Sequence, residues 1–210
     1  MIDSWAERRD RDASVVGSAL DGVTDALVGT TKAARAGDGD RVNAIIDRVR
    51  ERHVEVALRL VQQRGDFFET FCRRLDKQIA EILTILGSIT LLREVTPRAH
   101  DRAVSIGERL SSVLFAYSMM MRDLPGEFVE AEEVIWTNDR FGGATPRMDL
   151  TSEPARKTWL PIVERNHVTV LGGFIVRQGH GATTTRARHG PDYRAALVAA
   201  ADGASDVRRW

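Results

Sequence analysis

The most chemically suggestive stretch of this chain is a loop rich in threonine and arginine in its last third. An apolar run at residues 168–176, with the composition of a buried strand, precedes the loop, and a helix is expected to open after it at Asp192. In α/β proteins this order of strand, loop and helix N-terminus commonly binds phosphate or carboxylate groups, because backbone N–H groups and cations face the ligand. The stretch therefore predicts an anion site.

Two side chains of this loop are the best suited to such a site. The guanidinium of Arg188 can hold a carboxylate in bidentate fashion, although an arginine on a loop is also commonly solvated. Asp192 is placed to cap the first turn of its helix and to suit the helix dipole. A cap and a catalytic role do not exclude each other.

Two further candidates lie upstream. Thr24 stands at the start of an expected helix, where its hydroxyl can either cap the helix or bind an anion drawn to the exposed N–H groups. Glu108 lies on a helix next to Gly107, which allows close backbone approach. A lone glutamate on a helix is more often solvated or paired with a neighbour such as Arg109 or Arg102, so both interpretations of each residue remain open.

Four segments in the same order resemble conserved segments of the aspartokinase family. Residues 14–27 are similar to its early Val-Val-Ser-Ala-x-Gly-Gly-Val-Thr-Asp segment, and residues 105–111 to its Ser-x-Gly-Glu-x-x-Ser helix. Residues 137–142 read Thr-Asn-Asp-Arg-Phe-Gly, as in the lysine-sensitive branch, and Arg140 is a possible ion-pair donor there. Residues 173–193 resemble the strand and loop that follow in that family.

The resemblance implies a substrate, a cofactor and roles for individual residues. It implies ATP-dependent phosphorylation of the side-chain carboxylate of L-aspartate, the start of lysine, threonine and methionine synthesis, with ATP and Mg²⁺. Aspartate would be bound by Thr24, Glu108 and Arg188, with Glu108 on its amino group, and Asp192 would lie near the transferring phosphoryl group. The loop-lining residues are Thr183, Thr184 and Thr185.

The chain also departs from the family pattern where phosphate is handled. The family's catalytic lysine lies in a Lys-Phe-Gly-Gly-Thr segment, whereas the lysines here, Lys32, Lys77 and Lys157, have no flanking glycine. Pro191 removes an N–H group from the loop. We therefore expect a chain truncated at both ends, without the nucleotide-binding half or a regulatory domain. Two hypotheses follow: an aspartate kinase, or an inactive homologue or interaction module that keeps part of the aspartate-binding shell and pairs with itself or a full-length aspartokinase.

Composition excludes some other functions. Thirty basic and thirty acidic residues balance to a net charge of zero, which gives no electrostatic case for nucleic acid or a membrane surface. None of the five histidines stands at metal-ligand spacing, so no metal site is predicted. A single cysteine, Cys72, and the absence of an apolar signal segment favour a cytoplasmic protein.

The element pattern predicts an α/β fold of the amino-acid-kinase kind. Strands are expected at 13–19, 128–135 and 168–176, helices at 23–36, 40–63, 67–93, 96–121 and 154–166, and a loop at 138–146. This alternation predicts a mostly parallel sheet with helices on both faces, incomplete relative to the family. Residues 1–12 form a charged tail and 13–210 a partial kinase domain, in which the helices at about 40–93 make an antiparallel hairpin insertion.

Overall fold

The computed structural model describes residues 14–61 and 65–130 and shorter stretches beyond them. Those stretches are residues 133, 136–137, 153, 157–158, 161–162, 164–165, 167–172, 175–178 and 183–185. Four long helices lie in the described part: α2 (Val23–Ala36), α3 (Gly39–Val61), α4 (Gly65–Leu92) and α5 (Pro97–Met120). The strands are β1 (Ser14–Gly17), β2 (Gly126–Val129), β3 (Trp136–Thr137), β4 (Val168–Gly172), β5 (Ile175–Gln178) and β6 (Thr183–Thr185).

The described strands form two small sheets. In the first, the order is β1-β4-β2 and both pairings are parallel, with Val15 and Phe128 on either side of Val170. In the second, β5 pairs in parallel with β3 and antiparallel with β6. The carboxyl ends of β1, β4 and β2 therefore lie along one edge of the first sheet, which is where parallel sheets usually bind ligands.

The helices start and stop at residues that physical chemistry favours. Gly37 ends α2 in the left-handed conformation, with a φ of 75°, and its N–H group donates to the carbonyl of Ala34. Thr96 caps α5 by accepting a hydrogen bond from the N–H group of Ala99, and Pro97 stands at the first helical position. These signals match the helix boundaries expected from the sequence.

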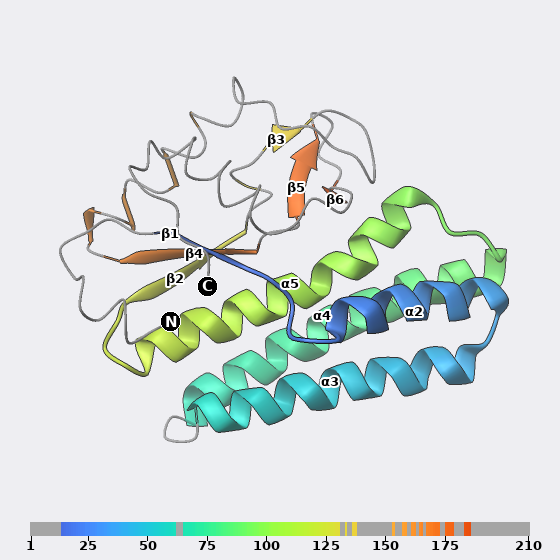
Figure 1. Cartoon of the computed structure of the whole chain (residues 1–210), viewed down its shortest axis with the longest axis horizontal. Helices are drawn as coiled ribbons and strands as arrows, with labels where there is room; N and C mark the ends of the chain where they lie inside the picture. The colour runs from blue at the N-terminus through green and yellow to red at the C-terminus, as the bar shows by residue number, and fades with distance from the viewer. Residues whose placement is uncertain are drawn as a thin grey trace.

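Helix α5 is the centre of the molecule. It is buried along most of its length and contacts β1, β2 and β4 as well as α2, α3 and α4 (Figure 1). The four helices share one apolar core, whose fully buried members include Leu27, Ile46, Leu75, Ile82, Leu86, Ile106 and Leu110. Each such side chain contributes about 1.5–3 kcal/mol on burial, so packing rather than helix propensity holds the helices together.

The structure confirms the α/β fold class with a parallel sheet. Helices α2, α3, α4 and α5 match the sequence prediction within a few residues. Helices α3 and α4 run antiparallel and pack on each other, and both also pack on α2 and α5. All four long helices lie on one side of the β1-β4-β2 sheet in Figure 1.

Two predicted strands were wrong in extent. The run at 168–176 is two strands of different sheets, because β4 ends at Gly172 and β5 begins at Ile175. Consecutive glycines at 172 and 173 carry no side chain to sustain an apolar strand. Strand β2 runs from Gly126 to Val129 instead of 128–135, and Glu133 is already helical. The predicted tail, the loop at 138–146 and most of the helix at 154–166 lie outside the described residues.

Among the described residues, none of the helices is long and apolar enough to span a membrane.

Candidate functional site

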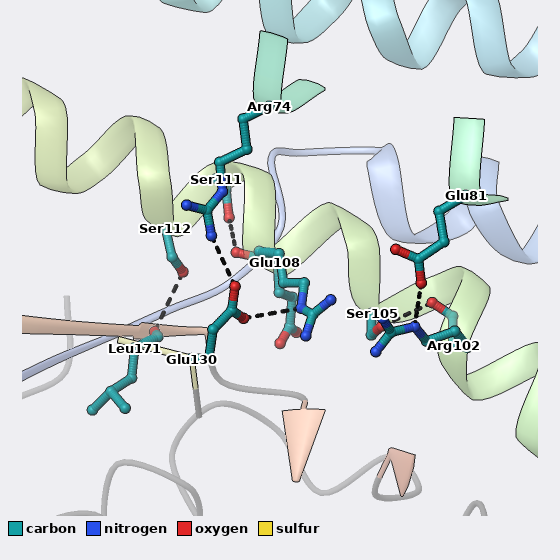
Figure 2. A network of polar contacts seen from close by, with 10 residues as sticks. Arg74, Glu81, Arg102, Ser105, Glu108, Ser111, Ser112, Glu130 and Leu171 are labelled. Carbon is teal, nitrogen blue, oxygen red and sulfur yellow. Dashed lines mark hydrogen bonds and ion pairs between the residues drawn. The ribbon is translucent and has the colours of Figure 1, made fainter. Parts of the chain in front are cut away.

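The carboxyl ends of β1 and β4 are bonded to the middle of α5. The hydroxyl of Ser111 donates to the carbonyl of Ser18, just after β1, at 2.5 Å. The hydroxyl of Ser112 donates to the carbonyl of Leu171 in β4 at 3.3 Å (Figure 2). Gly17 ends β1 so close to the helix that a Cβ there would lie 2.7 Å from the Ser112 hydroxyl oxygen. Helix and sheet are thus fixed together at the strand ends.

Glu108 lies one turn before these serines and is buried. Its exposed fraction is only 5%, and its carbonyl oxygen would lie 3.6 Å from a Cβ at Gly172, the last residue of β4. A carboxylate that is removed from water needs a positively charged or hydrogen-bonding partner. The fold therefore places a charged acceptor at the strand ends, as an ammonium-binding site would need.

Gly107 brings the first turn of α2 to the same place. A Cβ at Gly107 would lie 2.9 Å from Val23 Cγ1 and 3.2 Å from the Cβ of Ala19. Val23 is the first residue of α2 and the neighbour of Thr24. The absence of a side chain at 107 is what lets the first turn of α2 pack closely on α5.

Thr24 does not cap α2 in the structure. Gly22 occupies the cap position in the left-handed conformation, with a φ of 75° and no side-chain cap bond. Val23 donates to the carbonyl of Leu20 and Ala26 to that of Gly22, and the N–H groups of Thr24 and Asp25 between them have no acceptor among the described residues. The Thr24 side chain is exposed at this helix start. A helix N-terminus of this kind favours an anion.

A charged cluster that the sequence did not indicate lies beside Glu108. Glu130, the residue after β2, accepts a hydrogen bond from Arg74 of α4 at 2.8 Å, and its other carboxylate oxygen lies 3.1 Å from Nε of Arg109 (Figure 2). Arg102, the other pairing partner considered from the sequence, contacts Glu81 at 2.6 Å. Glu130 was missed because its partners are 21 and 56 residues away in the chain, and no local pattern encodes such contacts.

The threonine triplet forms a strand rather than a loop. Thr183, Thr184 and Thr185 make up β6, which pairs antiparallel with β5 and packs against α5. This placement brings the triplet against the helix that carries Glu108. Arg188 and Asp192 lie outside the described residues, as does the segment after Thr137, which ends β3.

The described residues of this edge do not fit the phosphates of a nucleotide. Lys32 and Lys77 are exposed on α2 and α4, and Lys157 pairs with Glu153 at 2.7 Å. The two guanidinium groups of the cluster, Arg74 and Arg109, are both engaged by Glu130. A phosphate site needs cations directed at the ligand, so we derive no step through ATP or Mg²⁺ from these residues.

A groove elsewhere in the described part lacks the groups for binding and phosphorylating a ligand. An open groove of about 480 Å³ lies between the start of α3 and the end of α4; its lining is Gly39, Val42, Asn43, Leu83, Gly87, Thr90, Leu91 and Arg93. Arg93 is its one charged lining residue and donates to the carbonyl of Ala36. Without carboxylates or histidines in its lining, this groove lacks the groups for phosphoryl transfer, and the site is better placed at Glu108.

Comparison with models of protein families shows the family to which this chain belongs. The model of the amino acid kinase family matches residues 7–210. This chain belongs to the amino acid kinase family. The assignment agrees with the parallel β1-β4-β2 sheet and with the position of the candidate site at its carboxyl edge.

Individual relatives point to the aspartokinases within this family. The lysine-sensitive aspartokinase 3 of Escherichia coli is 33% identical over 197 residues, which are 93% of this chain and 41% of that protein. The solved structure of Escherichia coli aspartokinase III with aspartate and ADP, in its R-state, superposes with a TM-score of 0.86 at 28% identity, over 98% of this chain and 43% of that one. The T-state structure of aspartokinase III with lysine and aspartate gives a TM-score of 0.83 at 30% identity, over 98% and 44%. The chain thus spans about two fifths of the length of aspartokinase 3.

Proposed function

We propose that this chain is an aspartokinase-type protein that binds L-aspartate at the carboxyl edge of the β1-β4-β2 sheet, as the acceptor for ATP-dependent phosphorylation of its side-chain carboxylate. The observation that carries the proposal is the burial of Glu108 on the turn of α5 whose Gly107 packs against Val23, in the first turn of α2. The similarity to solved aspartokinases that contain aspartate supports the choice of ligand.

The charges of the site suit an amino acid with two carboxylates. In this proposal the ammonium group of aspartate pairs with Glu108, and the attraction is strengthened by burial. One carboxylate lies at the start of α2, where the Thr24 hydroxyl and the N–H groups of Thr24 and Asp25 donate to it. In the proposal Arg188, which follows β6 in the sequence, binds the other carboxylate.

The proposed reaction requires little chemical help from the residues that bind the phosphoryl acceptor. A carboxylate is already an anion at neutral pH, so it needs no general base to become a nucleophile. The task of the acceptor site is to hold it in line with the phosphoryl donor. In the proposal MgATP would supply that phosphoryl group, with Asp192 near it and the β6 residues Thr183, Thr184 and Thr185 lining the site.

A second candidate function is an aspartate-binding module that does not transfer phosphate. The exposure of Lys32 and Lys77 and the pairing of Lys157 with Glu153 favour it, because phosphoryl transfer depends on cations directed at the phosphates. Such a module would act by pairing with another copy of the chain or with a full-length aspartokinase.

Calorimetric titration with L-aspartate tests the shared part of both functions. The unchanged chain is expected to bind, and Glu108→Gln to lose most of the affinity, since the amide carries no charge for the ammonium group. Glu127→Gln is the matched control, because Glu127 lies on β2 in an exposed ion pair with Arg165. No binding by the unchanged chain would refute the proposal.

Trapping the product separates the two functions. In a reaction with MgATP, hydroxylamine displaces phosphate from any aspartyl phosphate to give a hydroxamate, which is measured as its coloured complex with Fe³⁺. Aspartate-dependent hydroxamate that Glu108→Gln abolishes would establish the kinase. Binding of aspartate without hydroxamate would favour the non-transferring module.

A further inference from the structure

The connection between β1 and α2 is held by a side chain of α5. This connection, residues 18–22, leads from the carboxyl end of β1 to the first turn of α2. The hydroxyl oxygen of Ser111 lies 2.5 Å from the carbonyl oxygen of Ser18, at the start of the connection. It also lies 3.1 Å from the carbonyl oxygen of Glu108, in its own helix. Because the contact with Ser18 is the shorter, Ser111 donates chiefly to the connection.

A second contact between the connection and α5 lies one helical turn away. A Cβ at Gly107 would lie 3.2 Å from the Cβ of Ala19 and 2.9 Å from Cγ1 of Val23, the first residue of α2. Residues four apart lie on the same face of a helix, so Gly107 and Ser111 belong to one strip of α5. The connection is held to this strip at Ser18 by a hydrogen bond and near α2 by close packing.

The connection is a turn closed by its own backbone. Val23 donates to the carbonyl of Leu20 at 3.0 Å, and Gly22 has a φ of 75°, which glycine adopts at little cost. Because a turn closed in this way moves as a unit, a displacement of Ser18 is passed on to the first N–H groups of α2. Those are the groups to which the proposed function assigns a carboxylate of the ligand.

We propose that Ser111 is a positioning residue for ligand binding. Its hydrogen bond to the carbonyl of Ser18 holds the first turn of α2 in the place where that turn receives a carboxylate of the ligand. This inference rests on the proposed function, since it concerns the same aspartate site. It assigns to Ser111 no contact with the ligand itself.

Ser112 offers a matched control on the same helix. Its hydroxyl also donates to a backbone carbonyl of the sheet, that of Leu171 in β4, at 3.3 Å. Both serines are buried, with exposed fractions of 8% for Ser111 and 0% for Ser112. Ser112→Ala therefore removes a buried hydroxyl and a tie between α5 and the sheet, as Ser111→Ala does, but it leaves the hydrogen bond to the connection in place.

The test measures the affinity for L-aspartate by calorimetry on the full chain, at a temperature at which thermal melting shows each variant to be folded. Ser111→Ala is expected to bind aspartate about three- to tenfold more weakly, which is the effect of losing one hydrogen bond. Ser112→Ala is expected to stay within about twofold of the unchanged chain. Ser111→Cys, whose thiol is a weak donor, is expected to lie between the two, and it carries the comparison if Ser111→Ala does not fold.

Amide NMR without ligand gives a readout that a general loss of stability does not move. Ser111→Ala is expected to change the amide shifts of Thr24 and Asp25, and Ser112→Ala to leave them as they are. Equal losses of affinity in the two alanine variants, or no loss in either, would overturn the positioning role while leaving the proposed function intact. If the unchanged chain bound no aspartate, the proposed function would fail, and the role of Ser111 in binding with it.

Discussion

Glu108 and His53 show how the fold treats two ionisable side chains that it keeps from water. Glu108 is buried at the carboxyl edge of the sheet, where the proposed function pairs it with the ammonium group of aspartate. His53 is fully buried in α3, where its Nδ1 contacts the carbonyl of Val49 at 2.7 Å and its Nε2 has no hydrogen-bond partner among the residues that the structure describes. The pKa of His53 is lowered, first of all by burial, so the imidazole stays neutral in the folded chain.

His53 makes stability depend on pH. In the unfolded chain its pKa is about 6.5, whereas the folded pKa is lower, so the unfolded chain takes up the proton first. The free energy of unfolding is therefore expected to fall as the pH drops below about 6.5, by up to about 1.4 kcal/mol for each pH unit until the folded pKa is reached. Urea unfolding at pH 7.5 and 5.5 measures this.

The control for that prediction is His53→Leu, which removes the titrating group and fills the core. The difference in stability between the two pH values should shrink in this variant by the contribution of His53. The same pH dependence in both proteins would show that other groups cause it.

At the scale of elements, Gly107 sets the distance between α2 and α5. Gly107→Val places methyl groups where a Cβ alone would already lie 2.9 Å from Val23. We expect a loss of stability of about 1–3 kcal/mol and weaker aspartate binding, because the first turn of α2 moves away from Glu108. Thermal unfolding and aspartate titration of the variant check both.

Gly87 offers the matched helix control, since a Cβ there would meet nothing within 4 Å. Gly87→Val should leave stability unchanged or slightly raised, because glycine is the poorer helix former. If both valine variants lost stability equally, close approach at Gly107 would not be the cause.

The N-cap of α5 gives a second test at this scale. Thr96→Ala removes the acceptor for the N–H group of Ala99, and we expect a cost of about 1 kcal/mol in the free energy of unfolding. Thr84→Ala, whose exposed hydroxyl contacts the carbonyl of Ala80 in mid-helix, is expected to cost less. Urea unfolding of the two variants measures the difference, and an equal cost would argue against a capping role.

The helices were predictable from sequence and the strand limits were not, for physical reasons. Apolar residues at helical spacing, with Gly37 and Thr96 as end signals, define α2 and α5 locally. Where β4 stops and β5 starts depends on which sheet each joins, which is a tertiary property. In the same way, Thr24 and Glu108 could be named from their segments, but Glu130 and Arg74 could not, because only the packing of α4 and α5 on β2 brings them together.

At the scale of the whole molecule, two regions of the described structure are candidates for binding a ligand. The carboxyl edge of the β1-β4-β2 sheet combines a buried carboxylate, a helix N-terminus and a charged cluster. The groove between α3 and α4 combines exposed leucines, Leu83 and Leu91, with glycine and no acidic group. The proposed aspartate site lies at the carboxyl edge of the sheet, in keeping with the amino acid kinase fold.

The most direct measurement is amide-detected NMR of the isotope-labelled chain during titration with L-aspartate. We expect the largest changes in amide chemical shift at the N–H groups of Thr24, Asp25 and Glu108, in the first turn of α2 and the facing turn of α5. Shift changes confined to the groove between α3 and α4, or none at all, would contradict an aspartate site at the strand ends.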